Sequence, residues 1–119
     1  MIAFCDADDI WKKDKLKYQI EFMKKNNIHF SHCGYDIIDS NSKVIGSFLP
    51  KNILKFNDLI KSCDIGLSTV ILNKKILKKF SFSSLKTKED YLLWLRVIKY
   101  LKVFYGIKSK LVLWRKTEN

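Results

Sequence analysis

The fold that we expect for this chain is decided by residues 2–11, which read IAFCDADDIW. The segment begins as a continuous apolar run, which is typical of a strand covered on both faces. It ends in three carboxylates within four residues, Asp6, Asp8 and Asp9. Like charges repel one another where they crowd at the end of a strand, so this arrangement favours a function over stability. Ligands of α/β sheets bind beyond the carboxyl ends of the strands, which is where these carboxylates lie.

Length and composition predict one globular domain. The chain has 119 residues, of which 47% are hydrophobic and 13% are aromatic, and this composition argues against disorder. The net charge of +11 attracts anions such as nucleic acid, lipid headgroups or phosphorylated substrates. The lysines are spread along the chain without a long basic block, so most of them are expected on a solvated face.

The cysteines and the hydropathy pattern predict a cytoplasmic protein. Three cysteines without a CxxC spacing indicate neither a disulfide framework nor a zinc ribbon, and they fit a reducing compartment. We expect no signal peptide, because no charged segment precedes an apolar one. No apolar run reaches the roughly 18 residues that a membrane span needs.

Hydrophobic periodicity predicts alternating strands and helices. Strands are expected at residues 2–5, 28–38, 43–49, 65–72, 103–107 and 110–114. Helices are expected at residues 14–26, 56–62, 74–79 and 88–101, with Leu16, Ile20 and Met23 on the apolar stripe of the first and Asn57 as a cap of the second. A turn is expected at residues 39–42 and a polar loop at residues 81–86. The pattern is that of an α/β fold with a mixed sheet flanked by helices.

The first pair of carboxylates has the spacing of a cation site. Side chains alternate in an extended segment, so Asp6 and Asp8 point the same way. Mg²⁺ or Mn²⁺ is often held by one or two carboxylates together with substrate phosphates. The alternative is structural, with Asp8 or Asp9 capping a helical turn that starts at Ile10.

A second acidic site precedes the last long helix. Thr87 and Asp90 match the capping box [ST]-x-x-[DE], so Asp90 is interpreted first as a helix cap. A carboxylate near a helix N-terminus also stays ionised. An ionised carboxylate beside a sugar hydroxyl acts as a general base, and both roles stay open for Asp90.

The histidines do not predict a metal site. In a strand, His29 and Cys33 share one face while His32 lies on the other. Trp94 is expected in the core of the last helix, and Trp11 is a candidate wall of a sugar pocket. Arg115 ends the last strand, where it either reaches a donor phosphate or an acceptor, or is an ordinary surface arginine.

The sequence contains neither of the phosphate-binding loop motifs GxGxxG and GxxxxGK[ST]. Three interpretations of the chain remain at this point. The first is an enzyme that uses the carboxylates. The second is a non-catalytic basic module that binds nucleic acid or anionic membrane with strong salt dependence. The third is a non-functional remnant. Aromatic and basic residues do not interleave, so no nucleic acid is expected as a partner.

Four segments together resemble family 2 glycosyltransferases with the GT-A fold. Residues 2–11 with 14–20 look like the signature FLDADDxWxxDKLxxQ. Residues 65–70 resemble GxSTV, residues 89–95 resemble EDYxLWL, and residues 113–115 resemble a terminal YR. The order and the spacing of all four segments agree over nearly the whole chain.

The resemblance implies an enzyme that transfers a sugar, usually with inversion, from a nucleotide-diphospho-sugar to an acceptor. The acceptor would be a saccharide or a lipid-linked saccharide in cell-surface polysaccharide or glycan synthesis. Asp8 would hold Mg²⁺ or Mn²⁺ against the donor diphosphate, and Asp6 would contact the ribose side or the metal through water. Asp90 would deprotonate the acceptor hydroxyl, with Glu89 as its neighbour. The positive charge would favour peripheral association with the inner face of the cytoplasmic membrane. Neither the donor sugar nor the oligomeric state is indicated.

The chain departs from the family pattern at its start. The family opens with a strand of the type VSVIIPxYN that grips the nucleotide base, whereas this sequence begins at the DxD strand. We therefore expect residues 1–119 to be a single partial GT-A domain, Rossmann-like and without its N-terminal nucleotide-binding strands. Its exposed sheet edge would invite pairing, and the isolated chain would be a truncated, inactive fragment. Cys5, Lys13 and Trp114 replace the usual Leu, Pro and Tyr.

Overall fold

The computed structural model describes residues 1–80 and 89–116. Within these residues the fold is mixed α/β, with one sheet in the order β1-β6-β3-β7-β2, to which β4 is added beside β3 and β5 beside β7. The strands are β1 (Ile2–Ala3), β2 (Ile10–Trp11), β3 (Phe30–Ile38), β4 (Val44–Phe48), β5 (Ile53–Lys55), β6 (Ile71–Leu72) and β7 (Val103–Arg115). The helices are α1 (Lys15–Lys25), α2 (Phe56–Lys61), the 3₁₀ turn η1 (Leu67–Thr69), α3 (Lys74–Phe80) and α4 (Glu89–Leu101).

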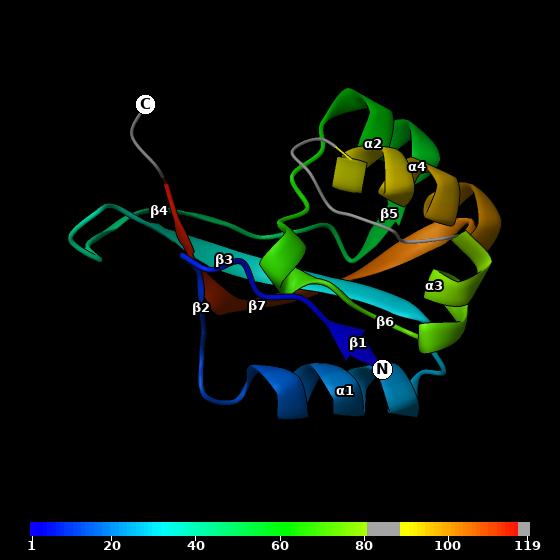
Figure 1. Cartoon of the computed structure of the whole chain (residues 1–119), viewed down its shortest axis with the longest axis horizontal. Helices are drawn as coiled ribbons and strands as arrows, with labels where there is room; N and C mark the ends of the chain where they lie inside the picture. Colours follow the sequence, from blue (N-terminus) through cyan, green and yellow to red (C-terminus); the bar gives the residue numbers. More distant parts are fainter. Residues whose placement is uncertain (81–88, 117–119) are drawn as a thin grey trace.

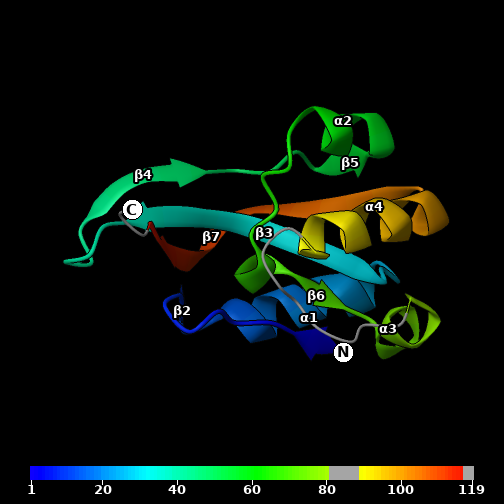
Figure 2. The ribbon, with the colours of Figure 1, turned by 45° about the horizontal axis from the view of Figure 1, so that its top comes forward.

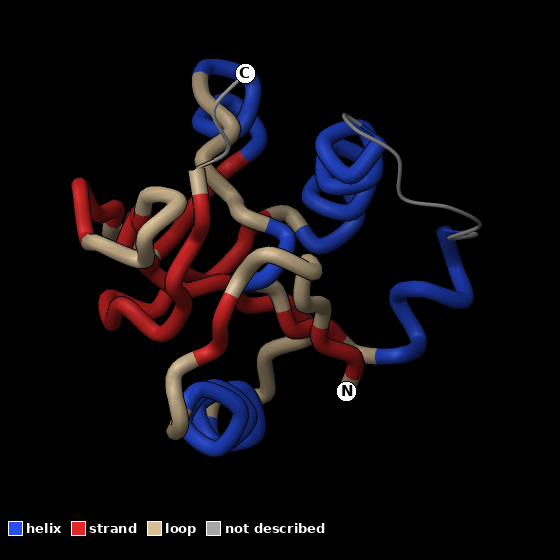
Figure 3. The backbone as a smooth tube through the Cα atoms, turned by 60° about the vertical axis from the view of Figure 1, so that its left-hand side comes forward, coloured by secondary structure: helices blue, strands red, loops and turns tan. Residues whose placement is uncertain are grey.

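The helices lie on both faces of the sheet. Helix α1 covers one face, whereas α2 and α4 lie side by side on the other (Figure 1). Turning the molecule shows β3 and β7 running between these layers, with β4, β5 and α2 on the side away from α1 (Figure 2). Helices lie on more than one side of the strands, while the strands at the left of the view have no helix beyond them (Figure 3). No described helix is both long enough and apolar enough to cross a membrane.

The centre of the sheet is the parallel pair β3 and β7, and the remaining strand pairs are antiparallel, which confirms a mixed sheet. β3 and β4 form the predicted hairpin around the turn at residues 39–42. The two C-terminal strands predicted from the sequence are one long strand. Its register against β3 shifts on both sides of Gly34, so the polar residues 108–110 interrupt the pairing pattern without ending the strand.

Helix α1 has nearly the predicted bounds but a different buried face. Asn27 ends it with a positive φ of 52°, a backbone conformation that asparagine tolerates better than most residues. The fully buried positions are Lys15, Gln19 and Met23. Leu16, predicted on the apolar stripe, is 40% exposed. The prediction for Leu16 was wrong because it rested on hydrophobicity alone, whereas two polar residues lie under the helix: Gln19 donates hydrogen bonds through its amide nitrogen, and the Lys15 ammonium lies over the Trp11 ring.

The main apolar core lies on the opposite face, under α4. Trp94 is fully buried, as predicted, and its ring lies 5.2 Å from Phe30, edge to face. Phe30 stacks on Phe104 at 3.7 Å between ring centroids. These three rings join α4 to the two central strands, so they fix the start of α4 over the sheet.

Two other predictions were wrong in detail. The segment 65–72 is not one strand: a 3₁₀ turn occupies Leu67–Thr69, and only Ile71 and Leu72 pair with other strands. Asn57 does not cap α2; instead the Asp58 carboxylate accepts the backbone N–H of Lys55 at 2.9 Å. The predicted loop at residues 81–86 lies outside the described residues.

Candidate functional site

The acidic segment after β1 forms a short loop that returns to the sheet as β2. The backbone N–H of Asp9 donates to the carbonyl of Asp6 at 3.0 Å, which closes the loop. The carboxylate of Asp9 accepts the Ser68 hydroxyl at 2.6 Å and the backbone N–H of Arg115 at 3.1 Å. Asp9 therefore ties the loop to η1 on one side and to the end of β7 on the other.

Ser68 is the central contact of this loop. Its hydroxyl accepts the backbone N–H of Asp6 at 2.9 Å while donating to Asp9. Its carbonyl accepts the indole N–H of Trp11 at 3.0 Å. Ser68 is buried, so these bonds are shielded from water. The strand predicted across residues 65–72 is interrupted here because η1 turns Ser68 toward the acidic loop.

With Asp9 occupied by structural bonds, Asp6 and Asp8 are left exposed. Within residues 1–80 and 89–116, no hydrogen bond or ion pair to either carboxylate is present. The alternative in which Asp8 or Asp9 caps a helical turn is wrong, because Ile10 starts strand β2.

The surroundings of Asp6 disfavour its negative charge. Partial burial raises the pKa of the Asp6 carboxyl, and the charges of Asp9, Asp90 and Asp8 raise it further. Asp90 lies 84 positions away in the sequence, yet its charge acts on Asp6. The fold therefore brings the two predicted acidic sites into one electrostatic environment.

Asp90 lies in the first turn of α4 and is half-buried. One of its carboxylate oxygens accepts the backbone N–H of Tyr91 at 2.9 Å, so the side chain satisfies an amide at the helix start. The predicted partner Thr87 and the side chain of Glu89 lie outside the described residues. Among the described residues, this bond engages only one of the two carboxylate oxygens of Asp90.

Trp11 has partners within the protein. Its indole N–H binds Ser68, and the Lys15 ammonium lies 4.7 Å from the ring centroid in a cation–π contact. The ring remains partly exposed. Its role as an acceptor wall stays a prediction.

Arg115 connects the acidic loop to the β3–β4 turn. Its guanidinium donates to the carbonyl of Asp39 at 2.8 Å, to the Ser42 hydroxyl at 3.0 Å and to the carbonyl of Asp8 at 3.3 Å. These bonds hold the backbone of Asp8 in place. Contact of Arg115 with a donor phosphate stays a prediction.

A divalent cation fits the donor set of the loop. Carboxylate oxygens are the ligands that Mg²⁺ and Mn²⁺ prefer, and the carboxylates of Asp6 and Asp8 are exposed in the loop after β1. Among the described residues, no three His, Cys, Asp or Glu side chains form a group able to hold a metal by themselves. Such a cation would need further oxygens from a substrate, as Mg²⁺ sites at phosphates commonly do.

Sequence comparison identifies relatives with named activities. Over 98 residues, 82% of this chain, it is 47% identical to WfgD of Escherichia coli, a UDP-Glc:alpha-D-GlcNAc-diphosphoundecaprenol beta-1,3-glucosyltransferase. WfaP of E. coli has the same named activity and is 37% identical over 92% of the chain. TuaG of Bacillus subtilis, a glycosyltransferase named for teichuronic acid biosynthesis, is 32% identical over 99% of the chain.

The chain belongs to the glycosyltransferases. This confirms the resemblance drawn from the four sequence segments. The glycosyltransferase chain spans 38%, 41% and 47% of the lengths of WfgD, WfaP and TuaG, respectively. A scan against protein-family models gave no match. Because the relatives are glycosyltransferases, the non-catalytic basic module is not favoured.

The sequence analysis of this glycosyltransferase missed Ser68 and Lys15 as parts of the site. Both residues lie in the segments that carry the family resemblance, at 65–70 and 14–20. Their positions within these motifs were therefore the signal by which the sequence could have identified Ser68 and Lys15. Their partners, Asp9 and Trp11, become apparent only when η1 and α1 are placed beside the acidic loop.

Proposed function

We propose that this chain forms the cation- and acceptor-side part of an active site that transfers a sugar from a nucleotide-diphospho-sugar to a saccharide or lipid-linked acceptor. The observation that carries the proposal is the convergence of Asp6, Asp8 and Asp90 in one environment, with Asp9 held in structural bonds beside them. The named activities of WfgD and WfaP support UDP-glucose as the donor and an undecaprenyl diphosphate-linked GlcNAc as the acceptor.

In this proposal Asp8 and Asp6 hold Mg²⁺ or Mn²⁺, which when bound supplies positive charge to the leaving diphosphate. Asp90 accepts the proton of the acceptor hydroxyl. The acceptor oxygen forms a bond to the anomeric carbon while the bond from that carbon to the diphosphate oxygen breaks. UDP-glucose carries an α-linked sugar, so a β-linked product corresponds to one inverting displacement.

The fold supports the assignment to a GT-A domain. Strand β1 pairs with β6 on one edge, and its other edge has no partner among the described strands. A further strand of the same sheet, with the nucleotide-binding segments of the family, would lie there. We place the activity at the cytoplasmic face of the membrane, where the net charge of +11 favours peripheral contact with anionic lipid.

The test is thermal unfolding, with Mn²⁺ and UDP, of a full-length form of the enzyme in which the nucleotide-binding strands are present. Ligands that bind only the folded state raise Tm, so the two together should stabilise the protein. Asp8→Asn should abolish this stabilisation, whereas Asp14→Asn, an exposed aspartate without a side-chain cap bond, should retain it. Asp90→Asn should retain the Mn²⁺–UDP stabilisation but lower sugar transfer by roughly 10²-fold or more. Retained stabilisation in Asp8→Asn would refute the cation assignment.

A further inference from the structure

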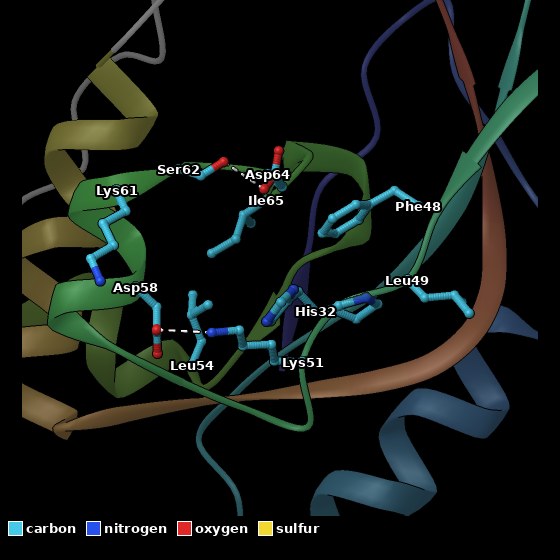
Figure 4. Close-up of a pocket in the computed structure, with 11 residues that line it drawn as sticks. His32, Phe48, Leu49, Lys51, Leu54, Asp58, Lys61, Ser62, Asp64 and Ile65 are labelled. Atoms are coloured by element: carbon cyan, nitrogen blue, oxygen red, sulfur yellow. Dashed lines mark hydrogen bonds and ion pairs between the residues drawn. The ribbon is translucent and has the colours of Figure 1, made fainter.

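A pocket of about 340 Å³ lies on the α2 face of the sheet, outside the acidic loop (Figure 4). Its volume is at the low end of the roughly 300–1,000 Å³ that small-molecule sites occupy. Apolar side chains form much of its wall: Phe48, Leu49, Leu54 and Ile65. They come from the end of β4, from β5 and from the segment that follows α2, so no single element forms the pocket.

His32 supplies a polar group to this pocket from β3. Its side chain is 2% exposed, and neither ring nitrogen has a hydrogen-bond partner in the described part of the chain. Figure 4 shows the imidazole in the middle of the labelled side chains. Buried polar groups are nearly always hydrogen-bonded, so two unpaired nitrogens facing a cavity point to a ligand.

The charge state of His32 limits the class of ligand. Burial lowers the pKa of His32 to about 4, so the ring is neutral near pH 7. A neutral imidazole donates through one nitrogen and accepts through the other. A hydroxyl group also donates and accepts, whereas a phosphate would require a charged donor to gain much affinity.

The charged residues that face His32 from the pocket wall balance one another. Lys51 and Asp58 form an ion pair at 3.0 Å, at the side of the pocket next to α2. The other two charged residues are Lys61 and Asp64, and the Asp64 carboxylate accepts the Ser62 hydroxyl at 2.7 Å. Among the described residues, the two cations and two anions of the pocket wall leave no net charge, which favours a neutral ligand over a phosphate.

The rim of the pocket adjoins the start of α4. Ser62 and Asp64 line the pocket on either side of Cys63 in the sequence. Burial raises the pKa of the Cys63 thiol, a hydrogen bond from the Ile65 backbone opposes this, and the charges of Asp90 and Asp64 raise it further. Asp90, the proposed base, is therefore an electrostatic neighbour of the pocket rim.

We propose that this pocket binds a neutral sugar residue of the acceptor, with His32 hydrogen-bonding to its hydroxyls and Phe48 packing against the ring. The inference rests on the function proposed above, because it identifies the bound sugar as part of the acceptor. It adds a binding residue on β3, distant in sequence from both acidic segments.

The experiment uses methyl α-D-N-acetylglucosaminide as the probe and the histidine ring signals in NMR as the readout. The protein has two histidines, so His29, which is exposed, serves as an internal control in the same spectrum. The glycoside should shift the His32 signals to saturation and leave those of His29 in place. Pyrophosphate should not shift the His32 signals.

Two variants test the pocket itself. His32→Phe keeps a ring of similar size without its hydrogen bonds and should weaken glycoside binding by about tenfold, as measured by isothermal titration calorimetry. Leu49→Trp enlarges a 52% exposed side chain at the pocket wall, so it should reduce binding without disturbing the core.

Absent or unsaturable shifts at His32, or an equal response to pyrophosphate, would overturn the inference. The Mn²⁺–UDP stabilisation of the full-length form separates the two proposals. If that stabilisation is present and His32 does not respond to the glycoside, the pocket inference alone fails. If His32 responds and Asp8→Asn leaves the stabilisation unchanged, the cation assignment fails and the pocket remains a sugar site.

Discussion

The two faces of the sheet are built by different means. Under α4, eleven buried residues of the described part of the chain form one apolar cluster that includes Trp94, Phe30 and Phe104. Under α1, the buried apolar clusters contain three residues each, and two fully buried positions of the helix are Lys15 and Gln19. The α4 face thus depends on burying apolar area. The α1 face combines small apolar clusters with the directed hydrogen bonds of Gln19, whereas the buried Lys15 ammonium has no hydrogen-bond partner among the described residues.

The difference follows from what each face must position. Apolar packing is strong but weakly directional. Hydrogen bonds fix the orientation of the groups that they join, and Gln19 donates to the Thr69 carbonyl at 2.8 Å and to the Ser31 hydroxyl at 2.9 Å. Thr69 follows Ser68, which binds the acidic loop. The polar face therefore connects α1 to the loop that carries Asp6 and Asp8.

The largest effect on this comparison should come from Trp94. Trp94→Ala removes the largest fully buried side chain of the α4 face and leaves a cavity between Phe30 and the helix. Truncations of this type cost about 3–5 kcal/mol in the free energy of unfolding. Urea denaturation measures the loss. Leu92→Ala, which changes a 57% exposed residue of the same helix, should stay within about 0.5 kcal/mol of the wild type.

A loss below about 1 kcal/mol in Trp94→Ala would contradict an α4 face held by apolar burial. Retention of Mn²⁺–UDP stabilisation in any folded fraction of this variant would sharpen the comparison. It would mean that the acidic loop depends on the α1 face rather than on the apolar core.

A smaller effect on stability, with a larger effect on the site, is expected for Ser68. Ser68→Ala leaves the partly buried carboxylate of Asp9 and the backbone N–H of Asp6 without this partner. Hydrogen bonds to charged groups contribute about 1.5–3 kcal/mol, so urea denaturation should show a loss in that range. The Mn²⁺–UDP stabilisation should weaken as well, because the loop loses its central contact.

Ser47→Ala is the matched control, since Ser47 is an exposed serine of β4. It should change neither stability nor ligand response. Unchanged ligand stabilisation in Ser68→Ala would show that Asp9 and Arg115 hold the loop without the serine.

The sequence predicted the elements that local patterns specify. Helix α1 and the β3–β4 hairpin lie within a few residues of their predicted bounds, because an asparagine stop and a turn cluster are local signals. The buried face of α1 and the interruption at Leu67–Thr69 were missed. Both depend on partners far away in the chain: the Ser68–Asp9 bond joins residues 59 positions apart.

The candidate site was likewise predicted only in part from the sequence. The acidic pair and Asp90 were proposed from motifs. Their proximity depends on the packing of the β1 segment against α4, where the Phe4 and Trp94 rings lie 6.4 Å apart, and no spacing in the sequence encodes it. His32 was considered only as a metal ligand. Its pocket is lined by residues between positions 48 and 65, so a sequence pattern around residue 32 carries no sign of it.

The smallest expected effect concerns the pH dependence of stability. It tests whether the His32 imidazole is buried and neutral in the folded protein. In the unfolded chain His32 has an ordinary pKa near 6.5, whereas in the folded protein burial lowers that pKa to about 4. Between these values the unfolded state binds a proton that the folded state does not, so acid favours unfolding. Lowering the pH from 7 to 5 should therefore cost the wild type about 2 kcal/mol through this group.

Asp6, whose pKa is raised in the folded state, acts in the opposite direction, but it does so equally in a His32→Phe variant. The difference in urea-unfolding free energy between the two proteins should thus change by about 2 kcal/mol over this range. His29→Phe, which alters the exposed histidine, should keep the wild-type dependence. Parallel pH profiles of the wild type and His32→Phe would mean that the buried imidazole takes up its proton in the folded state, which a ring enclosed in an apolar-walled pocket should resist.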